Sequence, residues 1–495
     1  MSMNRRTALK VGAGLGVAAG AGLLGHQLVP PSPSAQLERV DTLARELYST
    51  LDAEQRAETC VPYDHPLRQY HNRGVWGGGR EVVFGFSRRQ RRILTDLMYA
   101  GLSAEGRSRI PEEYFTRWAG IHSMRVLMCG LPRGSVHAAA GEPAESPYQI
   151  ILTGAHVNLR LGGNSREGAA FGGPQVYGDQ RGNERAGLPG NLYRDQFLLA
   201  QRLFQSLDPA RQQLALLDDA PVQTGIELQG MRGVFPGLAV AQLDPGQRTV
   251  TRALVERILA TYPAEDVAYA DACLQANGGI DGLFLSYYQR GDDGAIPEGQ
   301  VFRLEGPGAV LYFRGYPHVH AFINIAMDGD APLSSGDYLA DNPSWLDRAA
   351  VKTLFQAAMR AETGADLGFY PETSVAGRLR PGPIRSGDIY TLESWQESVE
   401  VGEIHGSLLD APTFAQMADA YRVLDRERIY TVATTTYGGG RLREQLGRVE
   451  SPHPRGMLRD LTVAYVRKHG FTHMAAGARS DVNAAASVGS PRNSS

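Results

Sequence analysis

Apolar residues recur along the chain with two different periods. Segment 44–52 carries apolar residues at helical spacing and ends in Leu-Asp, and the same pattern returns 156 residues later in segment 200–208. A second matched pair follows, in which Ser87 and Asp244 each stand at the N-cap position of an amphipathic run. The pattern has two interpretations: an internal repeat with a shared helical framework, or two copies of a common way to begin a helix.

Alternation of apolar and polar residues predicts three strands, over residues 149–161, 301–313 and 318–325. In the last of these, the odd-numbered residues are apolar and share one face, whereas His318 and His320 share the other. In the first, His156 shares a polar face with Asn158 and Arg160. Two predicted strands therefore each present a histidine on a polar face.

Composition and charge narrow the class of protein. Of the 495 residues, 42% are hydrophobic and 21% are charged, which is typical of a globular chain rather than a disordered one or a membrane bundle. The formal net charge is −3, so the chain lacks the positive field that sequence-independent binding to nucleic acid requires. We expect no nucleic-acid partner.

Three cysteines occur, and none forms a C-x-x-C pair. This count permits one disulfide with one remaining thiol, or three buried and inert thiols.

The N-terminus resembles a bacterial twin-arginine export signal. Arg5 and Arg6 are followed by an uncharged stretch over residues 11–28 and a proline-rich break. The resemblance implies export to the periplasm, the cell envelope or the medium, with a retained N-terminal membrane anchor as the alternative. We predict a signal over residues 1–35, a large domain over 36–345, a smaller domain over 346–474 and a disordered tail over 475–495.

The large domain resembles the bacterial domain-of-unknown-function 3500 family over about residues 40–340. That family usually has a Gly-His-His-Leu-Ser-like run where this chain has Gly154-Ala155-His156, so one histidine is missing. The resemblance implies a fold but no settled activity. The motifs that carry it, in order, are Phe86-Ser87-x-x-Gln90-Arg91, Leu102-Ser103-x-x-Gly106, the run from Leu152 to Leu159, the run from Phe302 to Pro307, and His318-Val319-His320.

The smaller domain resembles the C-terminal domain of bacterial 5'-nucleotidases over about residues 350–470. In those enzymes the domain clamps a nucleoside between two aromatic rings and holds it with Asn and Arg side chains. Here Trp395 takes the place of the first aromatic ring, and Arg378 and Arg380 are close enough to replace the family's arginine. The matching segments are 358–367, 382–384, 387–390, 399–406, 430–435 and 438–440. The fold class we predict is therefore α+β: a large mixed helix and sheet domain with an internal repeat as one interpretation, followed by a smaller α/β domain of this C-terminal type.

Histidines on adjacent strands can converge on one metal ion. His318 and His320 form an H-x-H pair, and His156 would complete a three-histidine site for zinc or a similar divalent ion. Glu305 would be the fourth ligand or the general base. The alternative is that the histidines are hydrogen-bonded polar residues on a partly exposed strand.

Three functions follow from these features. The first is a metal-dependent hydrolase with a nucleotidase-like accessory domain for its small-molecule substrate. The second is a non-catalytic protein that binds a nucleotide or another anionic ligand through Trp395, Arg378 and Arg380. The third is a 5'-nucleotidase-like hydrolase of nucleotide catabolism, although the Gly-Asn-His-Glu/Asp motif of the two-metal catalytic domain does not occur in the sequence. The sequence predicts no oligomeric state.

Overall fold

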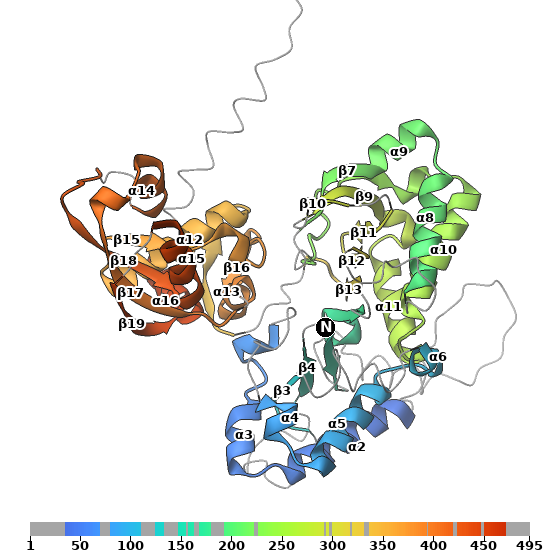
Figure 1. The fold of residues 1–495 in the computed structure, drawn as a ribbon. Helices are drawn as coiled ribbons and strands as arrows, with labels where there is room; N and C mark the ends of the chain where they lie inside the picture. The colour runs from blue at the N-terminus through green and yellow to red at the C-terminus, as the bar shows by residue number, and fades with distance from the viewer. Residues whose placement is uncertain are drawn as a thin grey trace, which may run out of the picture. The chain divides into compact units, whose positions relative to one another are not determined.

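The computed structural model (Figure 1) divides the chain into two compact units, residues 1–333 and 334–495. The fold is α+β, as predicted. Within the described part of the chain, no helix is long and apolar enough to cross a membrane. The predicted signal lies outside that part except for its last residue. The described residues are 35–69, 80–109, 124–132, 147–154, 157–162, 168–179, 193–221, 226–291, 294–296, 299–316, 319–330, 336–393, 395–418, 423–446 and 450–471.

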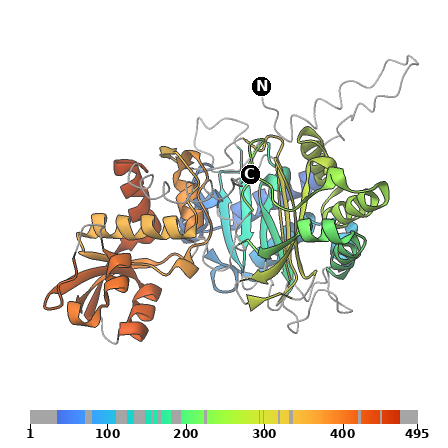
Figure 2. The same ribbon diagram turned by 90° about the horizontal axis from the view of Figure 1, so that it is seen from above.

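One mixed sheet organises the first unit, and its strands run side by side in Figure 2. At its margins β2 (Arg80–Glu81) pairs with β3 (Arg125–Cys129), and β7 (Leu216–Asp219) and β8 (Leu238–Ala239) pair with β9 (Phe284–Gly291). The main path among the described residues is β1 (Cys60–Val61), β3 (Arg125–Cys129), β4 (Gln149–Thr153), β5 (Val157–Leu161), β6 (Gln175–Asp179), β13 (Val319–Ile325), β12 (Ala309–Arg314), β11 (Val301–Gly306), β9 (Phe284–Gly291) and β10 (Gly294–Ala295).

Amphipathic helices bury their apolar stripes against this sheet. Helix α2 (Ala35–Thr50) packs on α5 (Arg88–Ala100), and α8 (Arg194–Gln205) packs on α10 (Pro245–Leu259). Leu47, Leu94, Leu203 and Leu254, one from each of these helices, are fully buried in the core that the sheet residues Leu304, Leu311 and Ile325 also enter. The helices are α2 (Ala35–Thr50), α3 (Ala53–Thr59), α4 (Val82–Gly85), α5 (Arg88–Ala100), α6 (Ala104–Arg109), α8 (Arg194–Gln205), α9 (Pro209–Ala215), α10 (Pro245–Leu259) and α11 (Ala264–Ala276).

The element order of the first unit occurs twice. The first repeat runs from α2 and α3 through β1, β2 and α5 to β3–β6, and the second runs from α8 and α9 through β7, β8 and α10 to β9 and β11–β13. Strand β1 pairs with β3 in parallel, as β7 does with β9. Strand β2 pairs with β3 in antiparallel fashion, as β8 does with β9. The two halves therefore share strand pairings as well as helices.

The N-termini of α5 and α10 are built alike. Ser87 and Asp244 are the N-caps, and each forms a capping box with the glutamine three residues later. Gln90 donates from Nε2 to the Thr50 carbonyl at 2.8 Å, and Gln247 donates from Nε2 to the Ser206 carbonyl at 2.8 Å. Because Thr50 and Ser206 are themselves 156 residues apart, these long-range bonds support the internal repeat over a common helix start.

The repeats meet at one pair of strands. Strand β6 ends the first repeat and β13 ends the second, and the two pair in antiparallel register with Tyr177 opposite Ala321 and Val176 opposite Phe322. We call this pairing the seam. It joins the two halves into one continuous sheet.

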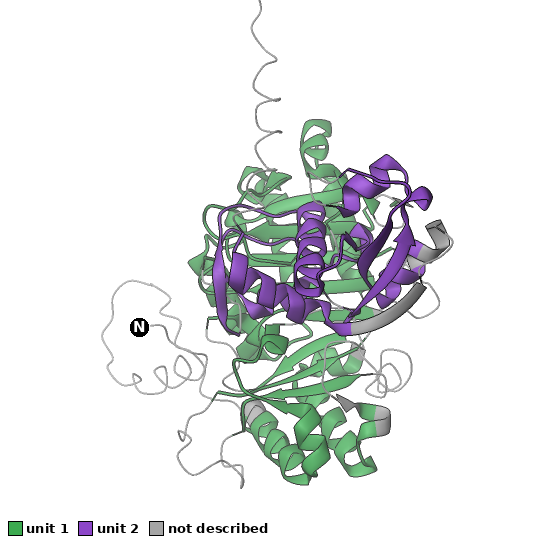
Figure 3. Ribbon diagram, turned by 90° about the vertical axis from the view of Figure 1, so that its left-hand side faces the viewer, with its two compact units in different colours: residues 1–333 green, residues 334–495 purple. Residues whose placement is uncertain are grey.

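The second unit (Figure 3) is a smaller α/β domain. Strands β15 and β18 are parallel, and β17 is antiparallel to β18 and to β19. Val351 of α12 and Val466 of α16 share a core cluster with Val399, whereas Phe414 of α14 packs with Val432 in another. The elements are β14 (Tyr338–Asn342), α12 (Arg348–Thr363), β15 (Leu367–Phe369), β16 (Gly382–Arg385), α13 (Ser386–Leu392), β17 (Ser398–His405), α14 (Ala411–Met417), β18 (Ile429–Thr435), α15 (Thr436–Leu446), β19 (Glu450–Met457) and α16 (Leu458–His469).

All three cysteines are free thiols. Burial raises the pKa of Cys60 to about 11 and the pKa values of Cys129 and Cys273 to about 12. This agrees with the interpretation as inert thiols, because a thiol that keeps its proton is a poor nucleophile and metal ligand.

The cap contacts that Gln90 and Gln247 share predict that both stabilise the fold, with a larger cost at Gln90, which also exchanges hydrogen bonds with the buried Gln55. We expect Gln90→Leu and Gln247→Leu each to lower the free energy of unfolding by about 1–3 kcal/mol, since each removes an N-terminal cap contact and leaves a carbonyl without its donor. Gln242→Leu, at an exposed position, is the control and should change it little. Urea denaturation measures the free energy of unfolding of all three variants. A large loss of stability on replacing only one of the two buried glutamines would contradict the repeat.

Candidate functional site

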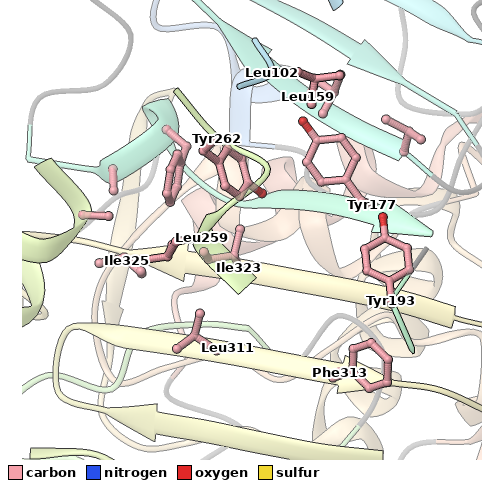
Figure 4. Close-up of a cluster of buried hydrophobic side chains, with 14 of the residues drawn as sticks. Leu102, Leu159, Tyr177, Tyr193, Leu259, Tyr262, Leu311, Phe313, Ile323 and Ile325 are labelled. Atoms are coloured by element: carbon pink, nitrogen blue, oxygen red, sulfur yellow. The ribbon is translucent and has the colours of Figure 1, made fainter. Parts of the chain in front are cut away.

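The polar face predicted for β13 exists and is buried. Val319, Ile323 and Ile325 enter the main core, as the alternation predicted (Figure 4). Phe322 lies on the opposite face in a second cluster with Val310 and Tyr312. His320 belongs to this second face, is 6% exposed and stands edge-on to the Phe322 ring at 5.9 Å. The expectation of a partly exposed strand is therefore corrected for His320.

The other two predicted histidine ligands, His156 and His318, lie outside the described residues. Strand β5 follows His156, and β13 follows His318. These two strands flank β6, and Val157 of β5 and Ala321 of β13 both pair with Tyr177. A three-histidine site stays a prediction. Within the described residues, no three His, Cys, Asp or Glu side chains gather in a way that could hold a metal ion.

Glu305 has a different position from the one predicted. It pairs across the sheet with Val310, which pairs with Asn324, four residues beyond His320 on β13. Two strand spacings and four residues of rise separate the Cα atoms of Glu305 and His320 by about 16 Å. A shared ion would need both ligands within about 2.2 Å of it, so the register does not bring Glu305 to His320. Alternation predicts the face of a residue but not its level along the sheet.

Glu305 is instead half of a buried ion pair. Arg303 is 4% exposed and Glu305 is 5% exposed, and Arg303 Nη2 donates to Glu305 Oε1 at 2.6 Å. Gln229 Nε2 donates to the same oxygen at 2.7 Å. Gln229 belongs to the segment between β7 and β8, whose Ile226 carbonyl also accepts a hydrogen bond from Asn324. These contacts give Glu305 a structural role.

In the second unit, the carboxyl ends of parallel strands meet the start of β17. Strands β15 and β18 end at Phe369 and Thr435, and Val399 near the start of β17 pairs with Thr435. Open parallel sheets bind ligands at this edge. Segment 393–397, which contains Trp395, therefore leads into the edge where a ligand site is expected, and Glu397 Oε2 accepts a hydrogen bond from the Tyr437 amide at 3.0 Å.

Glu393 is the most unusual residue of that segment. It is fully buried, and its Oε1 accepts a hydrogen bond from the Trp395 amide at 2.9 Å, while its Oε2 is buried without a hydrogen-bond partner. Burial raises the pKa of Glu393 to about 7, against the opposing effects of the Trp395 amide and the charge of Arg459. A carboxyl group that titrates near neutrality inside a protein is a candidate for function.

Two neighbours of Glu393 also have polar atoms without partners. Arg459 stacks over the Tyr390 ring at 4.6 Å, and its Nε and Nη1 are buried without acceptors. Gln396 has a buried Nε2 without an acceptor and a φ of 54°, a conformation that strains a residue with a side chain. We call Glu393, Trp395, Gln396 and Arg459 the Glu393 group.

Arg378 and Arg380, which were predicted to bind the ligand together with Trp395, contact other residues of this unit. The Arg378 guanidinium lies over the Trp345 ring at 4.3 Å, and Arg380 Nη2 donates to the Pro383 carbonyl at 3.2 Å. Trp395 itself is half-buried. Reading the sequence for aromatic and basic residues overlooked Glu393 and Arg459. The only signal was an acid two residues before Trp395, and its burial comes from segments far apart in the chain.

Comparisons with known proteins give a family and distant structures. A family model described as "Protein of unknown function (DUF3500)" matches residues 33–320. No curated protein matches. A 5'-nucleotidase precursor from Thermus thermophilus is 11% identical with a TM-score of 0.23, covering 37% of this chain and 51% of that one. The NAD nucleotidase of Haemophilus influenzae is 10% identical with a TM-score of 0.22, covering 38% and 55%. The chain thus spans about half the length of these structures.

A structural role for Glu305 predicts a loss of stability when it is removed. Glu305→Ala should lower the free energy of unfolding by about 3–5 kcal/mol, because it leaves Arg303 buried and uncompensated. The double variant Arg303→Met/Glu305→Leu should recover most of that loss. Asp219→Ala, which breaks the exposed pair with Arg290 in the same sheet, is the control and should change stability little. Chemical denaturation decides, and a Glu305→Ala protein as stable as the wild type would contradict the role.

The raised pKa of Glu393 predicts a pH dependence. The ordinary pKa is 4.5 and the folded value is about 7, so between these values the folded state binds the proton that the unfolded state has lost. The stability that Glu393 contributes should therefore fall as pH rises from about 4.5 to about 7, by about 3 kcal/mol in total, and be level above that. Glu393→Gln should remove this component.

The measurement is the free energy of unfolding of wild type and Glu393→Gln from pH 4.5 to 8.5. As pH rises from about 4.5 to about 7, the free energy of unfolding of the wild type should fall relative to that of Glu393→Gln. Glu403→Gln, at an exposed position of β17, controls for the loss of a surface carboxylate. A wild-type-to-Glu393→Gln difference that is constant with pH would contradict the assignment.

Proposed function

Because the chain belongs to the DUF3500 family, whose description names no activity, we propose its function from the site: the second unit binds a small, nucleoside-like molecule at the Glu393 group. The observation that carries the proposal is a fully buried carboxyl group with one unpartnered oxygen, next in space to the backbone of a half-buried tryptophan. A buried polar atom without a partner costs free energy, and a ligand that pairs with it recovers that cost.

The chemistry of the group defines the ligand. An indole ring stacks on flat aromatic rings, and stacking on a base contributes about 1–3 kcal/mol. With a pKa of about 7, Glu393 can accept a hydrogen bond as a carboxylate or donate one as an acid. A nucleobase offers a flat ring with donors and acceptors on its edge. The resemblance of residues 350–470 to a nucleoside-binding domain agrees with this ligand class, and Arg378 and Arg380 are the candidates for holding a phosphate.

The hydrolase interpretation depends on the other unit. It rests on His156, His318 and His320 as metal ligands, and the buried pair of Arg303 and Glu305 does not contribute a general base to it. We also propose that the protein acts outside the cytoplasm, because residues 1–35 resemble an export signal. Binding is the function that the described geometry supports best.

Calorimetry with a panel of nucleosides tests the proposal. We expect at least one nucleoside to bind the wild type and Trp395→Ala to weaken it by about 5- to 150-fold, which corresponds to the loss of one stacked base. Trp345→Ala is the matched control, since Trp345 is another partly exposed tryptophan of the same unit and should not affect a nucleoside without phosphate.

Two results would count against binding at this site. One is the absence of heat with every nucleoside and the corresponding nucleotides, and the other is equal affinity in wild type and Trp395→Ala. Release of phosphate from AMP by the pure protein, abolished by His320→Ala, would favour the hydrolase instead.

A further inference from the structure

Two ionisable side chains of the second unit lie near each other without forming an ion pair. Glu393 is the C-cap of α13 and is fully buried, and its Oε2 has no hydrogen-bond partner. Arg459 is the second residue of α16, and its Nε and Nη1 are buried without acceptors. The carboxyl group therefore has an unused acceptor and the guanidinium has two unused donors, so each group could supply what the other lacks.

A single aromatic ring keeps the two groups within reach of each other. The Arg459 guanidinium lies over the Tyr390 ring at 4.6 Å, and Tyr390 precedes Glu393 by three residues. Residues three apart at the end of a helix are neighbours on one face, separated along the axis by about one turn, or about 5 Å. A change of Arg459 rotamer is therefore enough to bring its donors to Glu393, with no rearrangement of either helix.

The proton on Glu393 decides whether the pair can form. Burial raises the pKa of Glu393 to about 7, and the nearby Glu397 carboxylate raises it further. The amides of Trp395 and Glu397 and the charge of Arg459 oppose that rise. Tyr370, directly after β15, also faces the two acids, but burial raises its pKa and it stays neutral. A protonated Glu393 has no charge to attract a guanidinium, whereas an ionised and buried Glu393 needs one.

The backbone beside Glu393 is attached to both members of the pair. The Trp395 amide donates to Glu393 Oε1 at 2.9 Å, and the Glu397 carbonyl accepts from the Leu458 amide, next to Arg459, at 2.9 Å. Between these two contacts lies Gln396, whose φ of 54° is strained. Strained backbone persists only while its surroundings hold it. A change in the contacts of Glu393 or Arg459 is therefore felt in the segment that carries Trp395.

We infer that Glu393 and Arg459 form a switch, which closes into a buried ion pair when Glu393 releases its proton to solvent and opens when Glu393 takes a proton up. The open form is the one described above, with Glu393 Oε2 unused and Arg459 on Tyr390. In the closed form Arg459 donates to Glu393 Oε2. Regulation of the ligand site rests on the proposed function: a nucleoside that needs this oxygen binds the open form, so its affinity falls as pH rises through neutrality.

Urea denaturation of the full chain without ligand, at pH 5 and at pH 8.5, tests the switch. The variants are Glu393→Gln, Arg459→Met and the double variant, because methionine keeps an unbranched side chain against Tyr390 and removes the charge. At pH 8.5 we expect Arg459→Met to lower the folding equilibrium constant about 10-fold more in the wild type than in Glu393→Gln. At pH 5 the two effects should be equal, since Glu393 is then protonated.

Arg467→Met is the matched control. Arg467 lies on the same helix and pairs with the exposed Asp337, so its replacement should have the same small effect at both pH values. Equal effects of Arg459→Met in the two backgrounds at pH 8.5, or a coupling that is already present at pH 5, would overturn the switch. No ligand is involved, so this failure is distinct from a failure of the proposed function.

A second measurement covers the case in which Arg459→Met does not fold. Crystal structures of the wild type at the two pH values should show Arg459 within about 3 Å of Glu393 Oε2 at pH 8.5 and stacked on Tyr390 at pH 5. The same Arg459 position at both pH values would overturn the switch.

Discussion

The pairing of β6 with β13 is the contact on which the first unit depends. Each repeat ends in one of these strands, and an unpaired final strand would leave a row of backbone donors and acceptors exposed at the edge. Pairing Tyr177 with Ala321 and Val176 with Phe322 removes both edges at once. The helices of both repeats then cover one face of a single sheet, so the two halves share one core.

The two repeats have diverged in the polar residues that they bury. A repeated framework needs apolar residues at equivalent helix positions, as Val40 shows in the first repeat. Gln196, at the position 156 residues later, departs from that requirement beside the seam, and its buried oxygen has no donor. On the opposite face the second repeat buries Arg303 and Glu305 beneath the segment that carries Gln229. Buried polar residues of this unit thus differ: Arg303 and Glu305 pair with each other, whereas Gln196 Oε1 has no donor.

The sequence predicted the periodic features well. Apolar spacing placed the matched helices, with Ser87 and Asp244 at their N-caps, and alternation assigned His320 to the face opposite Val319. It could not predict that Glu305 lies far from His320, because the level of a residue along a sheet depends on register between strands distant in the chain.

The burial of individual polar residues such as Glu393 could not be predicted from the sequence either. The pKa of Glu393 rises because the folded chain buries it completely, and no local pattern in the sequence marks such burial. The sequence analysis named Trp395, which stays a prediction, and did not name Glu393 two residues before it. Residues that depend on contacts across the fold are the ones that sequence reasoning missed.

Hydrogen–deuterium exchange of the full chain, with and without a nucleoside, tests most directly whether ligand binding resides in the second unit. We expect the nucleoside to slow exchange in segment 393–397 and at the start of α15, where the Tyr437 amide donates to Glu397, and to leave exchange in β5 and β13 unchanged. Slower exchange in β5 and β13 with no change around Glu393 would contradict binding in the second unit.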